Sequence, residues 1–194
     1  MLRIYGNRAL KTVPGLDTRP TSARVREALF NIWQGRLPGC RWLDLCTGSG
    51  AMGAEALCRG ATEVVGVELS PDAYKVTREN WQRVARADQT IRLFRGDVVK
   101  QLSRLHGQAF DLMYLDPPYD SGLYDPVLER VVALHLLAPG GEIAVEHRPG
   151  AWTAGLVPGL ELVRLKRYGT THLGFYAIPV AKTTVLGNGY STPV

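Results

Sequence analysis

Residues 42–53 read Trp42-Leu43-Asp44-Leu45-Cys46-Thr47-Gly48-Ser49-Gly50-Ala51-Met52-Gly53. The run from Trp42 to Cys46 predicts a short buried strand, the glycines predict a tight turn, and a helix is expected to start at Ala51. Glycines let a backbone approach a ligand closely, and the N–H groups at the start of a helix form a polar cradle. This stretch therefore predicts a cofactor-binding loop in an α/β protein.

The spacing of the glycines leaves two cofactor classes open. Gly48, Gly50 and Gly53 fit the dinucleotide fingerprint, and Glu68 follows at the end of the next strand, where an acidic residue binds ribose hydroxyls. A nicotinamide or flavin cofactor is therefore one reading. Asp44 favours the other, because its carboxylate would repel a pyrophosphate beside the loop but suits an ammonium group. S-adenosylmethionine carries an amino-acid ammonium and no phosphate, so the loop favours a methyl donor.

A second motif, Asp116-Pro117-Pro118-Tyr119, follows the apolar strand-like run from Phe110 to Leu115. The carboxylate is thus expected at the C-terminal end of a buried strand, where open α/β sheets bind ligands. Prolines have no N–H, so this stretch offers mainly acceptors, which suit an incoming amine. Tyr119 supplies a flat face for an extruded base. For these residues alone, a turn that closes a strand is an equally good reading.

Alternating patterns along residues 41–146 predict a doubly wound, mostly parallel sheet. Expected strands cover 41–46, 63–68, 90–94, 110–115 and 142–146, and expected helices cover 51–59, 72–86, 98–105 and 124–136. An antiparallel C-terminal hairpin is expected from 160–166 and 171–178, turning near residues 168–170. At the other end, 2–10 predicts an edge hairpin or arm, and a helix capped at Thr21 or Ser22 follows.

The chain is expected to form one domain, in which a basic arm and helix (1–40) join a catalytic body (41–179), followed by a disordered tail (180–194). Its 45% hydrophobic content is ordinary for a globular protein. Cys40, Cys46 and Cys58 lack paired metal-ligand spacing, which favours core thiols over a zinc site. Neither a membrane-spanning run nor a charged-then-apolar leader at Met1 is present, so a cytoplasmic protein is expected.

Positive charge is concentrated at the N-terminal end. Residues 1–41 hold eight basic and two acidic residues, a charge of +6, while the whole chain carries +5. This asymmetry suits a polyanionic partner that is bound by the N-terminal end of the chain. From charge alone, a solvated basic face is the simpler interpretation.

Several motifs in order resemble the bacterial small-subunit ribosomal RNA guanine-N2 methyltransferases over about residues 2–179. They are Arg19-Pro20-Thr21, Arg24-Val25-Arg26-Glu27-Ala28-Leu29-Phe30-Asn31, the loop 43–50, the Asp116–Tyr119 motif and Tyr168-Gly169-Thr170. The resemblance implies a Rossmann-like class I methyltransferase with a seven-stranded sheet. It also implies S-adenosylmethionine as the donor and S-adenosylhomocysteine as the product; the chemistry of the transfer needs no metal. The acceptor would be one guanine of 16S ribosomal RNA in a small ribosomal subunit, met by a monomeric enzyme. The chain departs mildly from the family at Cys46-Thr47.

The same resemblance assigns site residues. Those expected to bind the cofactor are Asp44, Thr47, Gly48, Ser49, Gly50, Glu68, Leu69, Asp97 and Val98. Those expected at the reacting centre are Asp116, Pro117, Pro118 and Tyr119. RNA contacts are expected at Arg8, Arg19, Thr21, Arg24 and Arg26. Asp97 would face the adenine amine, or would simply be a helix N-cap. Arg24 or Arg26 would contact phosphate, pair with Glu27 or close over the cofactor.

The chemistry of an aromatic amine explains the acceptor-rich motif. The lone pair of a guanine amine is delocalised into the ring, so hydrogen bonds from its N–H groups to Asp116 and the Pro117 carbonyl would direct that lone pair at the methyl group. The proton lost afterwards goes to Asp116 or to water. Two other functions use the same sequence features: a DNA adenine-N6 methyltransferase, although no separate recognition region is visible, and a non-catalytic ribosome-assembly protein.

Overall fold

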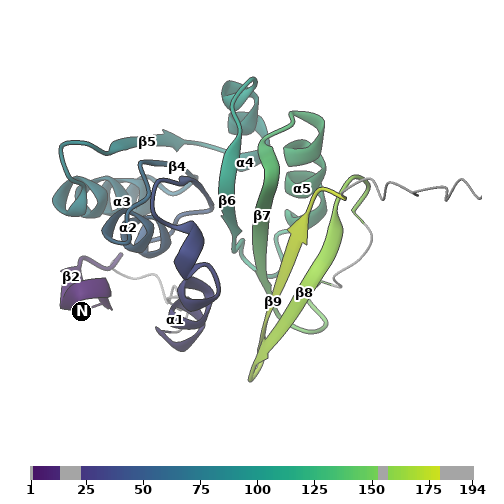
Figure 1. Cartoon of the computed structure of the whole chain (residues 1–194), viewed down its shortest axis with the longest axis horizontal. Coiled ribbons are helices and arrows are strands. Elements are labelled where there is room, and N and C mark those ends of the chain that lie inside the picture. Colours follow the sequence, from purple (N-terminus) through teal and green to yellow (C-terminus); the bar gives the residue numbers. More distant parts are fainter. Residues whose placement is uncertain (1, 14–22, 153–156, 180–194) are drawn as a thin grey trace, which may run out of the picture.

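The computed structural model describes residues 2–13, 23–152 and 157–179. Its main feature is a seven-stranded sheet (Figure 1). The strands are β3 (Arg41–Leu45), β4 (Glu63–Glu68), β5 (Thr90–Arg95), β6 (Phe110–Leu115), β7 (Leu137–His147), β8 (Glu161–Tyr168) and β9 (Thr171–Ala177). Their spatial order is β5-β4-β3-β6-β7-β9-β8. Strands β3 to β7 are parallel to one another, and β9 runs antiparallel to both β7 and β8. The expected fold class, a mostly parallel doubly wound sheet with an antiparallel C-terminal hairpin, is confirmed.

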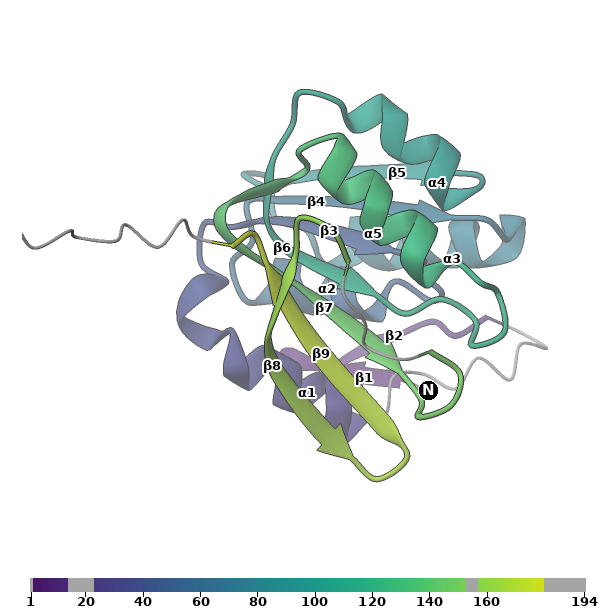
Figure 2. The ribbon, with the colours of Figure 1, turned by 90° about the vertical axis from the view of Figure 1, so that its right-hand side faces the viewer.

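Helices cover both faces of the sheet (Figures 1 and 2). They are α1 (Ala23–Ile32), α2 (Ala51–Cys58), α3 (Pro71–Val84), α4 (Val98–Gln101) and α5 (Tyr124–Ala133). One core cluster joins α1, α2 and α3 to alternate residues of β3, such as Trp42. The other joins α4 and α5 to the intervening residues, such as Leu43 and Leu45. The apolar strand runs are buried on both faces, as a parallel sheet requires.

The N-terminal residues form a separate hairpin. Strands β1 (Leu2–Ile4) and β2 (Arg8–Leu10) pair with each other in a two-stranded sheet and do not extend the main sheet. The hairpin lies beside α2 and α3, where the Arg59 guanidinium sits 4.6 Å from the Tyr5 ring centroid. Of the two expected alternatives, an edge hairpin or an arm, the structure has the arm: a hairpin that does not join an edge of the main sheet.

The largest differences from the expected bounds concern α5, β7 and α4. Helix α5 ends at Ala133 rather than at 136, because His135 adopts a positive φ of 53°. Strand β7 then begins at Leu137 and runs to His147, where a strand over only 142–146 was expected. The expected helix over 98–105 is divided, because the 3-10 segment η3 (Leu102–Leu105) replaces its second half. The expected cap at Thr21 or Ser22 and the tail 180–194 lie outside the described residues. In the part of the chain that is described, no helix is long and apolar enough to span a membrane.

The three cysteines are free thiols. Cys40 is buried, and burial raises the pKa of its thiol to about 12. Cys46 and Cys58 are half-buried, and burial raises the pKa of each of these thiols as well. All three thiols are therefore neutral near pH 7, as expected of thiols that pack rather than react.

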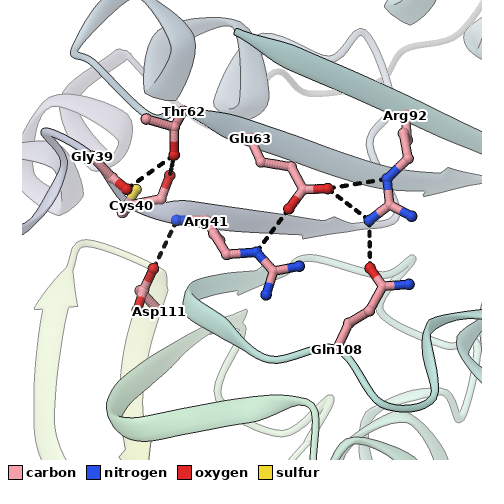
Figure 3. A network of polar contacts seen from close by, with 8 residues as sticks. All are labelled: Gly39, Cys40, Arg41, Thr62, Glu63, Arg92, Gln108 and Asp111. Atoms are coloured by element: carbon pink, nitrogen blue, oxygen red, sulfur yellow. Dashed lines mark hydrogen bonds and ion pairs between the residues drawn. The ribbon is translucent and has the colours of Figure 1, made fainter.

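An ionic network closes the amino-terminal end of the sheet, away from the glycine loop (Figure 3). Glu63 of β4 accepts hydrogen bonds from Arg41 Nε at 2.7 Å and from Arg92 Nη2 at 2.7 Å. Arg92 also donates to Gln108, and the Asp111 carboxylate accepts the Arg41 backbone N–H at 2.7 Å. The network thereby ties together β3, β4, β5 and the start of β6.

Replacing Glu63 with glutamine is expected to destabilise the fold by about 1–2 kcal/mol near pH 7, because two half-buried arginines lose their shared anion. Partial burial raises the pKa of Glu63, but Arg41 and Arg92 together outweigh it and leave that pKa below its ordinary value. A lowered pKa stabilises the fold above the unfolded-state pKa and is lost as pH falls through the folded-state value. Urea unfolding from pH 7 downward should therefore show a constant difference from wild type above about pH 5, which shrinks as pH falls below the ordinary glutamate pKa of about 4.3 and through the lower folded-state value. A difference that does not shrink as pH falls below about 4 would contradict this.

Candidate active site

The two motifs meet at one point of the sheet. Strands β3 and β6 are adjacent and parallel, with Leu45 opposite Leu115. The residues that follow each strand therefore emerge side by side at the carboxyl edge. Strand β4 lies on one side of this pair and β7 on the other, so this is where the strand order reverses. Ligands of doubly wound sheets bind at that position, and here it joins the glycine loop to Asp116.

Side chains of helix α3 hold the glycine loop by donating hydrogen bonds to the backbone carbonyls of the loop. Thr77 Oγ1 donates to Gly48 O at 2.9 Å, Asn80 Nδ2 to Ser49 O at 2.9 Å, and Trp81 Nε1 to Gly50 O at 2.8 Å. Three consecutive carbonyls are thus satisfied from the α3 side. These three hydrogen bonds fix the backbone of the loop to α3.

The glycines of this loop serve different purposes. Gly50 has a positive φ of 74°, and a Cβ there would lie 2.7 Å from Thr77 Cγ2. A Cβ at Gly53 would lie 2.4 Å from Trp81 Cζ2, so this glycine allows α2 and α3 to pack. At Gly48 a Cβ would meet no atom within 4 Å, although φ is +57°. The space beside Gly48 is therefore open for a ligand.

Glu68 connects the loop to the end of β4. Its Oε2 accepts the Gly48 N–H at 2.7 Å and its Oε1 accepts the Ser70 N–H at 2.8 Å. Thr47, which is buried, places its hydroxyl 3.4 Å from the same carboxylate. Leu69 follows with 70% of its surface exposed. The Glu68 carboxylate suits ribose hydroxyls, and the exposed Leu69 side chain suits a flat base. Both assignments stay predictions.

Asp44 is a fully buried carboxyl whose pKa lies far above that of an ordinary aspartate. It is 1% exposed, and its carboxylate accepts the Gly53 N–H at 3.1 Å. Burial raises its pKa to about 7; the hydrogen bond from Gly53 lowers the pKa and the nearby Glu68 charge raises it further. Among the residues that the structure describes, no cation forms an ion pair with Asp44. A buried carboxyl beside a second carboxylate favours a cationic group as its ligand.

Asp97 caps a helix, which was one of its two expected roles. Its Oδ1 accepts the Lys100 N–H at 2.9 Å at the start of α4. Val98 is buried in the core, so a cofactor would meet its backbone rather than its side chain. The contact from Asp97 to an adenine amine stays a prediction, and its second carboxylate oxygen is the atom that would make it.

The Asp116–Tyr119 motif follows β6 directly. Pro117 is buried, Pro118 is exposed, and Asp116 and Tyr119 are half-buried. Burial, then the charges of Asp116, Tyr119 and Glu146, raises the pKa of the nearby Tyr124. The motif therefore combines a buried proline with a carboxylate and an aromatic ring that both reach the surface. Its role in holding an amine stays a prediction.

The residues expected to contact RNA divide into three groups. Arg8 and Arg24 are exposed, while Arg19 and Thr21 lie outside the described residues. Arg26 is 4% exposed; its Nε donates to Glu55 Oε2 at 2.8 Å and its Nη2 to Arg3 O at 2.7 Å. Burial and these two bonds disfavour the expected phosphate contact by Arg26, which stays a prediction. Among the described residues Arg26 pairs with Glu55 rather than with Glu27, because α1 packs against α2.

Sequence reasoning missed Asn80, which links the N-terminal segment to the cofactor loop. Besides its bond to Ser49 O, its side chain accepts the Lys11 N–H at 2.9 Å and donates to Lys11 O at 3.0 Å. A signal was available, since Thr77, Asn80 and Trp81 share one helix face at i, i+3 and i+4 spacing. The signal did not reveal which segments that face would meet.

Comparison with known proteins gives the family. A family model described as "Conserved hypothetical protein 95" matches residues 2–177. The chain belongs to this family. One relative is a candidate rRNA methyltransferase from Bacillus subtilis, 30% identical over 171 residues, covering 87% of this chain and 92% of the relative. Another is ribosomal RNA small subunit methyltransferase D of Haemophilus influenzae, 28% identical, covering 74% of this chain and 75% of the relative.

A solved structure from Escherichia coli, described as a candidate methyltransferase, superposes with a TM-score of 0.79. It is 27% identical, and the match covers 90% of this chain and 96% of that one. The resemblance to bacterial small-subunit ribosomal RNA methyltransferases that the motifs indicated is confirmed, as is the class I methyltransferase fold. Within this family fold, Asp44, the glycine loop and Glu68 meet the Asp116–Tyr119 motif at one edge of the sheet.

Proposed function

We propose that this protein transfers a methyl group from S-adenosylmethionine to the exocyclic N2 amine of one guanine in 16S ribosomal RNA, in the small ribosomal subunit. The observation that carries the proposal is that a site suited to a cation and a site suited to an amine meet where the strand order reverses, between β3 and β6. Asp44 is a buried carboxyl that suits a cation, and the Asp116–Pro118 stretch is rich in acceptors for an amine. A nicotinamide or flavin cofactor would instead bring a pyrophosphate close to the buried Asp44 carboxyl.

The residues present fit the proposed donor. Asp44 would hold its ammonium, the open space beside Gly48 would receive its amino-acid portion, and Glu68 would accept from ribose hydroxyls. When bound, the donor supplies an electrophilic methyl group on a sulfonium. The Asp97 carboxylate and the exposed Leu69 would lie along the base of the donor. To accept a hydrogen bond from a ribose hydroxyl, Glu68 Oε2 must either give up the hydrogen bond from the Gly48 N–H or accept both at once.

The acceptor side is built to orient an amine. Asp116 and the Pro117 carbonyl would accept the two N–H groups of the guanine amine, while Tyr119 would stack on the ring. Two donated hydrogen bonds favour a pyramidal nitrogen, whose lone pair then points at the methyl group. The proton released after attack leaves toward Asp116 or water. Because no covalent bond to the protein is required, positioning and fixed dipoles supply most of the acceleration.

Curated relatives named ribosomal RNA small subunit methyltransferase D support this class of acceptor. The exposed arginines Arg8 and Arg24 add a basic surface suited to RNA phosphates. The proposed enzyme acts as a monomer in the cytoplasm, and its N-terminal hairpin belongs to the same domain as the sheet.

The test is methyl transfer from radiolabelled S-adenosylmethionine to unmodified small ribosomal subunits, naked 16S RNA and duplex DNA in parallel. Labelled RNA is then digested to nucleosides and separated. We expect label as N2-methylguanosine from RNA of the subunit. Label in DNA as N6-methyladenine would replace the proposal with a DNA methyltransferase. Tight donor binding without transfer to any of the three would favour a non-catalytic assembly protein.

A further inference from the structure

Arg148 lies over the ring that the proposed function assigns to the target base. Its guanidinium carbon is 4.3 Å from the centroid of the Tyr119 ring. Arg148 directly follows β7, which pairs in parallel with β6. It therefore reaches the carboxyl edge of the sheet beside Asp116. None of the sequence motifs drew attention to it.

The guanidinium has unused hydrogen-bonding capacity. Its Nε is buried and, among the described residues, has no hydrogen-bond partner. A buried donor without an acceptor costs about 1–3 kcal/mol. An arginine in this position would gain free energy from an acceptor that arrives with the substrate.

The backbone around Arg148 is held in place, so the side chain is the part free to rearrange. The Arg148 carbonyl accepts the Ala151 N–H at 3.2 Å. Trp152 stacks on Tyr124 with ring centroids 4.9 Å apart, and its Nε1 donates to Asp125 Oδ1 at 2.9 Å. Both ends of this short turn are thus anchored to β7 and α5.

We propose that Arg148 selects guanine: it covers Tyr119 in the free protein and moves to the edge of the stacked base, where it donates hydrogen bonds to O6 and N7. Guanine presents two acceptors on this edge, and a paired contact from arginine to them is the commonest specific contact to that base. Adenine has an amino group in place of O6, so two donors would face each other. The inference rests on the proposed function and adds to it the residue that reads the base.

The test uses RNA in which the target position carries either guanine or 2,6-diaminopurine. This analogue keeps the N2 amine but replaces O6 with an amino group. The position is first mapped with wild-type protein, and the RNA is then assembled by ligation of a synthetic segment and, where needed, reconstituted into subunits. Wild-type protein is expected to favour guanine by about 10–100-fold in kcat/KM.

Arg148→Met should lower kcat/KM for guanine by a similar factor and change that for diaminopurine little, so the preference collapses toward 1. Arg148→Lys, which keeps the charge but loses the planar fork, should restore only part of the preference. Arg104→Met is a matched control, because Arg104 also lies over a ring, 4.9 Å from the centroid of Phe94. The control should leave the preference unchanged.

An unchanged preference in Arg148→Met would overturn the inference, and so would an equal loss on both bases, which would assign the arginine to the RNA backbone. Donor affinity, measured by calorimetry, should be the same in all variants. A wild-type protein that methylates neither RNA would instead count against the proposed function itself. The two failures are therefore distinguishable.

Discussion

Replacing Asp116 with asparagine is expected to lower kcat for methyl transfer by about 10²–10³-fold while donor affinity stays within about threefold. Asparagine has nearly the same size, so the turn after β6 is retained. However, it offers one acceptor oxygen in place of two and turns an NH2 donor toward the substrate amine. The amine would then lose a charged acceptor and its orientation. Single-turnover assays with saturating RNA, together with calorimetry of the donor, separate the two effects.

Asp120→Asn is the matched control, since Asp120 is an exposed acid just beyond the motif. It removes the same charge from the same surface and should keep wild-type kcat. If Asp116→Asn also kept wild-type activity, the carboxylate would not hold the amine, and the acceptors would have to be sought elsewhere at this edge. A fall in both variants would indicate only a general effect of charge on RNA binding.

Most of the fold was predictable because it depends on local patterns. The apolar runs that became β3, β4, β5 and β6 are short, end in turn residues and alternate with helical segments, and their bounds agree with expectation to within a residue. The errors in element bounds occurred where packing between elements, rather than the local pattern, determined where an element ends. The predicted helix over 124–136 stops at Ala133 because the chain must turn at His135 to enter β7. Nothing in the apolar pattern of that segment marks a positive φ.

The candidate site was predictable to a lesser extent. Asp44, Glu68 and Asp116 could be located because each ends or nearly ends a strand, and strand ends of a parallel sheet converge. Arg26 could not be placed, since its partner Glu55 lies on another helix and a charge pattern alone does not show packing. Asn80 and Arg148 act through contacts between elements distant in sequence. Only the folded arrangement shows that Asn80 joins two segments and that Arg148 covers Tyr119.

Replacing Asp44 with asparagine is expected to weaken donor binding by about 10–100-fold, because a charge-assisted hydrogen bond to the ammonium is lost. The same change should stabilise the protein without donor at pH 8. Burial raises the pKa of Asp44 to about 7, so keeping this carboxyl ionised in the folded protein costs free energy. Asparagine resembles the neutral acid and avoids that cost while still accepting the Gly53 N–H.

The sign of the pH dependence separates this explanation from a simple packing effect. An acid whose pKa is higher in the folded than in the unfolded state contributes less to stability as pH rises between the two values. The stabilisation of Asp44→Asn over wild type should therefore be absent near pH 4, grow toward pH 7 and level off above it, reaching a few kcal/mol at most. Asp72→Asn, which removes an exposed acid from α3, should show no such growth.

Donor binding should show the complementary dependence in wild type. Between pH 5.5 and 7.5 the ammonium of the donor stays largely protonated, whereas Asp44 changes from neutral to ionised. Affinity measured by calorimetry should then rise with pH in wild type and remain flat in Asp44→Asn, and wild type should release a proton on binding at pH 6.5. If the two proteins bound the donor equally and with the same pH profile, Asp44 would only pack the turn against α2. Burying the Asp44 carboxyl would then destabilise the fold with no ligand to compensate. The open space beside Gly48 argues against that outcome, because it leaves room for a ligand next to the loop.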